Sequence, residues 1–291
     1  FAQYDSLPNI SDIRERNASR LRLMDRARKV SLHVRAVDPT LTDEPGGKLD
    51  RAVVEIKRIY TKWARDKGTQ LVFLDRGVPK SAGDAAIIKA YDAAVAVRDA
   101  AEASGDQVAF GKANDALDTF DANEIAELRQ AQTSTWNGYQ HIKDGLVAAG
   151  IPDNEIAFVQ NYNSDLAKEA LFTAVNDGSI RVLIGSTPRM GAGTNVQERL
   201  VALHHIDATW KPSDIEQREG RIIRQGNSLY EKYNTQASPF EVEILAYVTE
   251  RTVDAKLWSL NSAKLKMVNG IRYYDGSFEM DFEDADADNM A

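Results

Sequence analysis

The sequence has no cysteine and no long apolar segment, and both absences narrow the class of protein. Without cysteine there are no disulfides and no thiolate metal sites, a composition typical of proteins in a reducing compartment. No apolar run approaches the ~18 residues that a membrane helix requires, and the N-terminus lacks the apolar core of a signal peptide. We therefore predict a soluble, cytoplasmic protein with no membrane partner.

A net positive charge is also absent, since 36 basic and 44 acidic residues give a formal charge of −8. This balance argues against a wholly basic nucleic-acid binder. Charge is unevenly distributed, however: residues 14–35 carry eight basic and two acidic side chains, whereas residues 276–291 carry six acids and no base. Local charge is therefore more informative than the total. The chain opens at Phe1 rather than methionine, and we interpret it as a segment of a longer polypeptide.

Apolar periodicity predicts an α/β fold. A helical stripe begins at Leu49, with spacings of four and three, and leads into a buried strand at 70–75. Further apolar runs, separated by helical patterns, predict strands at 156–160, 181–185, 203–207 and 241–248. Strands that alternate with helices are typical of a parallel sheet flanked by helices.

Three further regions surround this predicted domain of residues 49–268. Residues 1–48 form a basic helical extension, whose charged face is either solvated or in contact with a nucleic-acid backbone. Residues 81–131 are rich in alanine and acids and predict an inserted helical hairpin, which is either simply exposed or docks another domain. Residues 269–291 form an acidic tail that we expect to be disordered.

A loop that follows the strand at 181–185 concentrates groups suited to phosphate. Gly191 and Gly193 allow positive φ and close approach of the backbone, and amides that lead into a helix make an anion site. Hydroxyl, guanidinium and amide side chains surround the glycines, at Ser186, Thr187, Arg189 and Asn195. A glycine-containing turn after a buried strand is also common without any ligand, so the loop alone leaves both interpretations open.

A second cluster follows at residues 217–226, where Arg218, Arg221 and Arg224 are spaced three apart. On a continuous helix this spacing predicts one face with a ladder of guanidinium groups, which bind phosphate oxygens in pairs. Gly220 within the helical pattern costs ~1 kcal/mol against alanine and indicates that something approaches closely there. The alternative is a solvated basic face that pairs with nearby acids.

Together the two clusters resemble motifs V and VI of superfamily-two helicases, and more closely those of Swi/Snf-type DNA translocases. Ser186-Thr187 with Gly191-x-Gly193-x-Asn195 is similar to motif V, and Gln217-x-x-x-Arg221-x-x-Arg224 is similar to motif VI. Trp210-Lys211-Pro212 resembles the W-x-P that precedes motif VI. The closest resemblance is to the helicase half of large phage and mobile-element methylase-helicase proteins, over residues 45–75 and 135–265. Pro188-Arg189-Met190 departs from the smaller residues usual in motif V.

The resemblance implies the C-terminal RecA-like lobe of an ATP-dependent DNA motor, working in the cytoplasm or in a host cytoplasm after phage injection. Its expected partners are DNA, the N-terminal lobe of the same protein and a methylase domain. Arg224 is then the arginine finger, with Arg221 beside it on the phosphates and Gln217 coupling the lobes. The residues expected to border ATP are Gly191, Gly193 and Asn195. The residues expected to face nucleic acid are Ser186, Thr187, Arg189 and Trp210.

The sequence contains no G-x-x-x-x-G-K-[ST] phosphate loop, and Asp43-Glu44 lies in a proline-glycine segment rather than after a strand. We therefore expect Mg²⁺ to be held mainly by the absent lobe, and this chain alone to bind ATP poorly and not to hydrolyse it. No metal site is predicted, because His204 and His205 alternate to opposite faces of a strand. A nucleic-acid-binding module without motor activity and a docking domain remain alternatives.

Overall fold

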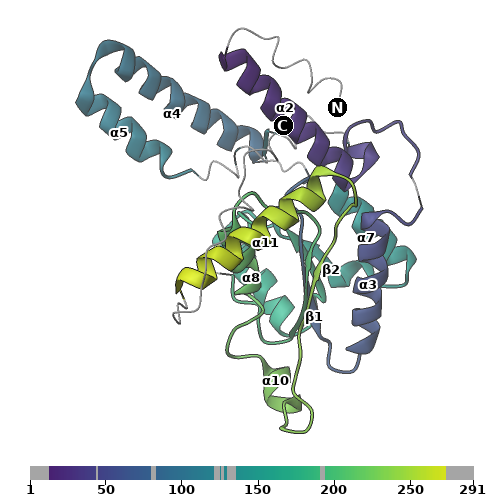
Figure 1. Ribbon diagram of the computed structural model, residues 1–291. Coiled ribbons are helices and arrows are strands. Elements are labelled where there is room, and N and C mark those ends of the chain that lie inside the picture. Colours follow the sequence, from purple (N-terminus) through teal and green to yellow (C-terminus); the bar gives the residue numbers. More distant parts are fainter. Residues whose placement is uncertain are drawn as a thin grey trace.

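The computed structural model describes residues 13–43, 45–79, 83–120, 125, 128–129, 136–190 and 194–272. Five parallel strands form one sheet in the order β2-β3-β1-β4-β5 (Figure 1). The strands are β1 (Thr69–Phe73), β2 (Ile156–Phe158), β3 (Val182–Gly185), β4 (Leu200–His205) and β5 (Glu243–Ala246). The prediction of an α/β fold with a parallel sheet flanked by helices is confirmed.

Strand β1 is the centre of the sheet, paired in parallel with β3 through Leu71 and Leu183 and with β4 through Leu71 and Leu203. Every residue of β1, β3 and β4 is buried. Burial along the whole length of a strand is typical of parallel strands covered on both faces. Since all five strands run the same way, their carboxyl ends meet at one edge of the sheet.

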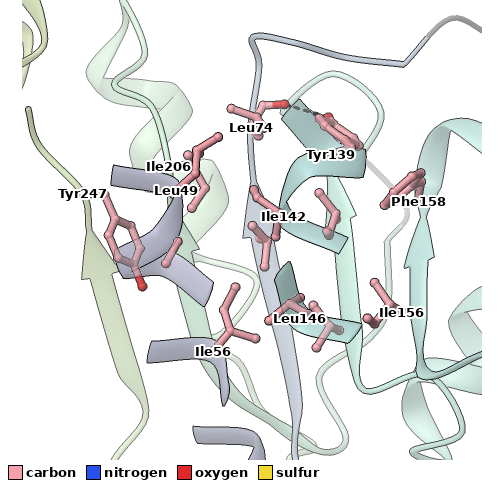
Figure 2. Close-up of a cluster of buried hydrophobic side chains, with 14 of the residues drawn as sticks. Leu49, Ile56, Leu74, Tyr139, Ile142, Leu146, Ile156, Phe158, Ile206 and Tyr247 are labelled. Carbon is pink, nitrogen blue, oxygen red and sulfur yellow. Dashed lines mark hydrogen bonds between the residues drawn. The ribbon is translucent and has the colours of Figure 1, made fainter. Parts of the chain in front are cut away.

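One face of the sheet is covered by α3 (Lys48–Lys62) and α7 (Gly138–Ala148), which pack on each other. Figure 2 shows Leu49 and Ile56 from α3 beside Ile142 and Leu146 from α7, against side chains of the strands. The Tyr139 hydroxyl donates a 2.6 Å hydrogen bond to the Leu74 carbonyl just beyond β1. This bond satisfies the polar end of a buried tyrosine and fixes the start of α7 at the carboxyl edge.

The opposite face is covered by α8 (Asp165–Asn176), which begins at the capping residue Ser164. Leu171 and Val175 of α8 pack with Leu71 and Phe73, the β1 residues that alternate to this face. Two short helices, α9 (Pro212–Glu219) and α10 (Ser228–Tyr233), separate β4 from β5, and α10 was not predicted.

The extensions form long helices. Helix α2 (Ile13–Leu32) and the C-terminal helix α11 (Val253–Arg272) pack together, and α11 also contacts α9. Helices α4 (Asp84–Ser104) and α5 (Gln107–Leu117) pack into the predicted hairpin, which projects away from the sheet (Figure 1). Much of the rest of the insertion lies outside the described residues. The tail predicted for 269–291 begins within α11, so the expected disorder of residues 269–272 is wrong, and the rest of that tail lies outside the described residues. No helix in the described part of the chain is long and apolar enough to cross a membrane.

Candidate functional site at the carboxyl edge of the sheet

Polar residues from three neighbouring strands meet at the carboxyl edge. Asp75 follows β1, Thr187 follows β3 and Asp207 follows β4. The backbone N–H and the hydroxyl of Thr187 donate to Asp75 Oδ1 at 2.7 and 2.9 Å, and the Asp75 N–H donates to Asp207 Oδ2 at 3.0 Å. Open α/β sheets bind ligands at this edge. Here the edge between these three strands is occupied by a hydrogen-bonded network within the chain.

Arg218 of α9 occupies the centre of this network. Its side chain is fully buried, with Nη2 at 2.7 Å from Asp75 Oδ2 and 3.6 Å from Asp207 Oδ1. Its Nε donates to Thr187 Oγ1 at 2.8 Å, and Nη1 donates to the Asp207 carbonyl at 3.1 Å. This guanidinium therefore binds two carboxylates, a hydroxyl and a carbonyl, and it joins α9 to three strands. Few of its N–H donors remain for a ligand.

The pKa values of the two carboxylates are shifted in opposite directions. Burial opposes ionisation of Asp75, but Arg218 and the Thr187 hydrogen bonds outweigh it and lower the pKa of Asp75. Burial and the adjacent Asp75 carboxylate raise the pKa of Asp207 to about 6.

A second buried guanidinium, Arg28 of α2, donates to the Ala208 carbonyl and lies 5.0 Å from the centre of the Trp210 ring. Burial and Arg76 lower the pKa of Arg28 to about 10. Because Arg28 belongs to α2, its hydrogen bond to Ala208 connects the network to the N-terminal extension.

The three arginines do not form a ladder on one helix, and that prediction is wrong. Helix α9 ends at Glu219, and Gly220 is its C-terminal cap, with an N–H that donates to the Glu216 carbonyl at 2.8 Å. Gly220 is therefore a helix end rather than an interior position of close approach. Only Arg218 lies on the helix, and Arg221 and Arg224 lie in the turns that follow.

Arg221 and Arg224 face the loop that follows β3. Arg221 Nη1 donates to the Thr194 carbonyl at 3.4 Å, and Arg224 Nη1 donates to Asn195 Oδ1 at 2.9 Å. Between them Ile222 is buried in the core cluster on the α8 face of the sheet, which anchors the segment. Neither guanidinium lies within 4.0 Å of a carboxylate of any described residue.

The two guanidiniums differ in exposure. Arg224 is exposed, whereas Arg221 is half-buried. Burial, and then the neighbouring Arg224, lower the pKa of Arg221. Among the described residues these two cations have only neutral hydrogen-bond partners. One of the cations is also partly desolvated, so an anion would stabilise the pair.

The predicted phosphate loop is described only in part. Gly191 and Gly193 lie outside the described residues, while Asn195 is exposed and Thr194 is buried. Met190 is buried against Gly185, where a side-chain carbon added to the glycine would lie only 2.8 Å from Met190 Cγ. Met190 therefore packs over the glycine at the end of β3.

The predicted nucleic-acid contacts lie in different environments. Ser186 is fully buried and accepts a 3.3 Å hydrogen bond from Gln160 Nε2, so its expected place on a nucleic-acid surface is wrong. The Thr187 hydroxyl is used by Asp75 and Arg218. Arg189 is largely buried, with Nη1 at 3.5 Å from Asn163 Oδ1. Trp210, by contrast, is 49% exposed, and Gln217 is exposed on α9.

A cleft of about 430 Å³ lies between α8 and the loop after β3. Arg189, Thr194 and Asn195 line its loop side, and Lys168 and Asn176 line its helix side. The cleft therefore borders Asn195, which accepts the hydrogen bond from Arg224. Sequence reasoning missed the α8 side, since Lys168 and Asn176 belong to no motif and reach the loop only through the fold.

His204 and His205 have separate partners, as their alternation predicts. The His204 ring lies 2.8 Å from the Tyr247 hydroxyl and 2.9 Å from Gln70 Oε1, and burial lowers its pKa to about 3. His205 lies 3.3 Å from Glu219 Oε1 on the other face. The two rings act as interior hydrogen-bonding groups of β4.

No protein-family model matches the sequence, and no curated protein matches it. Among the solved structures that match is the C-terminal part of the Fun30 ATPase domain, with 15% sequence identity and a TM-score of 0.40. The match covers 76% of this chain and 48% of that structure, so the chain spans about half of its length. A similarity this low leaves the residues of the sheet edge as the basis for a functional assignment.

Proposed function

We propose that this chain is the second lobe of a nucleic-acid-dependent ATPase motor, in which Arg221 and Arg224 bind the phosphates of ATP held by another lobe. The observation that carries the proposal is the pair of guanidiniums beside the loop after β3. Among the described residues, both guanidiniums donate only to neutral acceptors. Arg224 is exposed and can exchange an amide oxygen for a phosphate oxygen, which is a stronger partner because it is charged.

Arg221 supports the same assignment through its environment. It is half-buried next to a like charge, and burial with Arg224 lowers its pKa. A triphosphate oxygen between the two guanidiniums would relieve this repulsion and stabilise both cations. Arginine fingers of this kind stabilise the charge that develops on the γ-phosphoryl group during transfer. Mg²⁺ would be held by the phosphate-loop lobe, as the resemblance to helicases implies.

The nucleic-acid side of the proposal rests on Trp210. The indole is 49% exposed and backed by the Arg28 guanidinium, an arrangement that can stack on a base while the cation attracts the backbone. Gln217, exposed on α9, is proposed to contact the other lobe. DNA is the proposed polymer because the motifs resemble DNA translocases.

The decisive variant is Arg224→Ala in a polypeptide that joins this chain to a phosphate-loop lobe. We expect DNA-stimulated ATP turnover to fall by about 10³- to 10⁵-fold with DNA binding retained. Arg98→Ala is the matched control, since Arg98 lies on the α4–α5 hairpin and pairs only with its neighbour Asp99 among the described residues. Unchanged turnover in Arg224→Ala would contradict the proposal.

The same variant distinguishes the alternatives. Lost DNA binding with unchanged ATP turnover would assign Arg224 to a nucleic-acid-binding module. The isolated chain is expected not to hydrolyse ATP. DNA-stimulated turnover by the isolated chain that disappears in Arg224→Ala would show that it needs no second lobe.

A further inference from the structure

A second polar cluster shares no residue with the network at the carboxyl edge and has no part in the proposed ATPase. It consists of His33, Asp43 and His141, and one potential ligand atom from each lies within 4.8 Å of the others. The residues come from three segments: His33 precedes the short 3-10 helix η2 (Val34–Ala36), Asp43 lies in the loop before α3, and His141 lies on α7. The cluster joins the N-terminal extension to the helical layer of the core.

Aromatic packing holds the two imidazoles in place. The His33 ring stacks on Trp136 with centroids 5.0 Å apart and planes 7° apart, and its centroid lies 4.8 Å from that of His141. The loop that carries Asp43 is exposed, so its carboxylate can adjust to the two rings. A rigid pair of rings beside an adjustable carboxylate is suited to closing around a small ion.

The donor set is that of a transition metal. Imidazole nitrogens with a carboxylate oxygen bind Zn²⁺ and related divalent ions. With Zn–N bonds of about 2.0–2.1 Å, ligand atoms around a tetrahedral ion lie about 3.3 Å apart. His33 Nε2 is already 3.4 Å from Asp43 Oδ1, and all the ligand atoms lie within 4.8 Å of one another, so the rings and the carboxylate would close by at most about 1.5 Å to reach the tetrahedral value.

Coordination would release one of the surrounding polar contacts and keep another. His33 Nδ1 accepts a 3.2 Å hydrogen bond from the Arg35 N–H, so coordination through Nε2 would place the ring proton on Nδ1 and release that long bond. Arg35 Nη1 lies 3.3 Å from Asp43 Oδ2 and would orient the carboxylate. A further carboxylate lies beside the cluster, with Asp50 Oδ1 at 3.9 Å from His141 Nε2. Such hydrogen-bonded partners commonly orient the ligands of a metal.

We propose that His33, Asp43 and His141 bind one divalent transition-metal ion of the zinc class, which ties the N-terminal extension to α7. Three protein ligands leave a fourth position for water or Asp50. The inference is independent of the ATPase assignment, because no residue of the sheet edge takes part in it.

The test is metal titration of the full chain after removal of metal by a chelator. Co²⁺ is followed by its visible absorption and Zn²⁺ by calorimetry. We expect one ion per chain and a higher melting temperature with Zn²⁺. His141→Gln and Asp43→Asn should each weaken binding at least about tenfold and remove the metal-dependent rise in melting temperature.

Asp153→Asn is the matched control, because Asp153 is an exposed carboxylate that pairs with Lys143 of α7 at 3.0 Å, outside the cluster. It should bind metal as the wild type does. Absence of binding, or equal affinity in wild type, Asp43→Asn and Asp153→Asn, would overturn the proposal. If His141→Gln fails to fold, Asp43→Asn decides the question, since its change is confined to an exposed loop.

Discussion

Arg218 and Arg224 belong to one short stretch of sequence but to different parts of the molecule. Arg218 is fully buried, with two carboxylates within 3.6 Å, and joins α9 to the strands. Arg224, six residues on, is exposed and hydrogen-bonded only to the amide oxygen of Asn195 among the described residues. Identical side chains therefore have a structural role at one position and an available charge at the other.

The end of α9 creates this difference. Had the helix continued, residues three apart would lie on the same face. Because the helix stops at Gly220, Arg218 points into the sheet edge, whereas Ile222 turns into the core and directs Arg221 and Arg224 toward the loop after β3. Charge spacing alone therefore does not identify a phosphate site, since the partners of each guanidinium decide which charges are available.

The largest effect on stability is expected from Arg218→Ala. The substitution leaves Asp75 and Asp207 as adjacent acids without their central cation, and breaking a buried ion pair in this way costs about 3–5 kcal/mol. Urea unfolding of the full chain measures the loss. Arg218→Lys should retain part of the stability, because it keeps the charge but not the planar fork.

Arg224→Ala is the comparison variant and should change the free energy of unfolding by less than about 0.5 kcal/mol, as is usual for surface substitutions. Equal losses in Arg218→Ala and Arg224→Ala would break the distinction between the two arginines. A negligible loss in Arg218→Ala would show that Arg28 alone can hold the two carboxylates.

A smaller effect on stability is expected from acid, and it distinguishes the interior of β4 from the exposed segment that carries Arg224. Burial lowers the pKa of His204 to about 3 from an unperturbed 6.5. The unfolded chain therefore takes up the proton first, and the stability that neutral His204 contributes above pH 6.5 is lost as pH falls toward its folded pKa. Between about pH 6.5 and about pH 4.5 this single group accounts for a loss of about 2 kcal/mol.

His204→Gln should reduce the pH dependence by that amount, measured as the difference in unfolding free energy between the two pH values. Arg224→Ala, a change at an exposed position, should keep the wild-type pH dependence. A steep wild-type dependence that persists unchanged in His204→Gln would assign it to other groups.

The smallest effect is expected from Asn195→Ala. Asn195 is exposed, and its side chain accepts only from Arg224 among the described residues, while its backbone carbonyl accepts from Asn176. Removing the amide should change stability by less than about 0.5 kcal/mol and leave Arg224 freer. A loss of several times this size in thermal unfolding would mean that the Arg224–Asn195 pair is part of the structural framework.

Periodicity was sufficient to predict the sheet. The five strands and the helices α3, α7 and α8 follow the apolar patterns closely, because each buries an apolar face against the same core. Helix α10 was missed because its six residues are too short to show a helical period. The end of α9 was misplaced because Gly220 is compatible with either a helix interior or a cap, and the packing of Ile222 decides between them.

The site was predictable only as far as its motifs extend. The sequence indicated Arg221, Arg224 and Asn195, which the structure brings together, but it did not reveal that Ser186 is buried or that Arg218 binds Asp75 across 143 positions of chain. Contacts between distant segments follow from topology. The same reason explains why the cluster of His33, Asp43 and His141 carries no spacing that a metal motif would show.

The most direct test of the division between structural and available arginines is their reactivity in the folded chain. Arginine-selective dicarbonyl labelling, followed by mass spectrometry over time, reports each guanidinium separately. The structure predicts that Arg224 reacts first, that half-buried Arg221 reacts more slowly, and that Arg218 reacts only as fast as the protein unfolds. Reaction of Arg218 at the rate of Arg224, or protection of Arg224 equal to that of Arg218, would contradict the account.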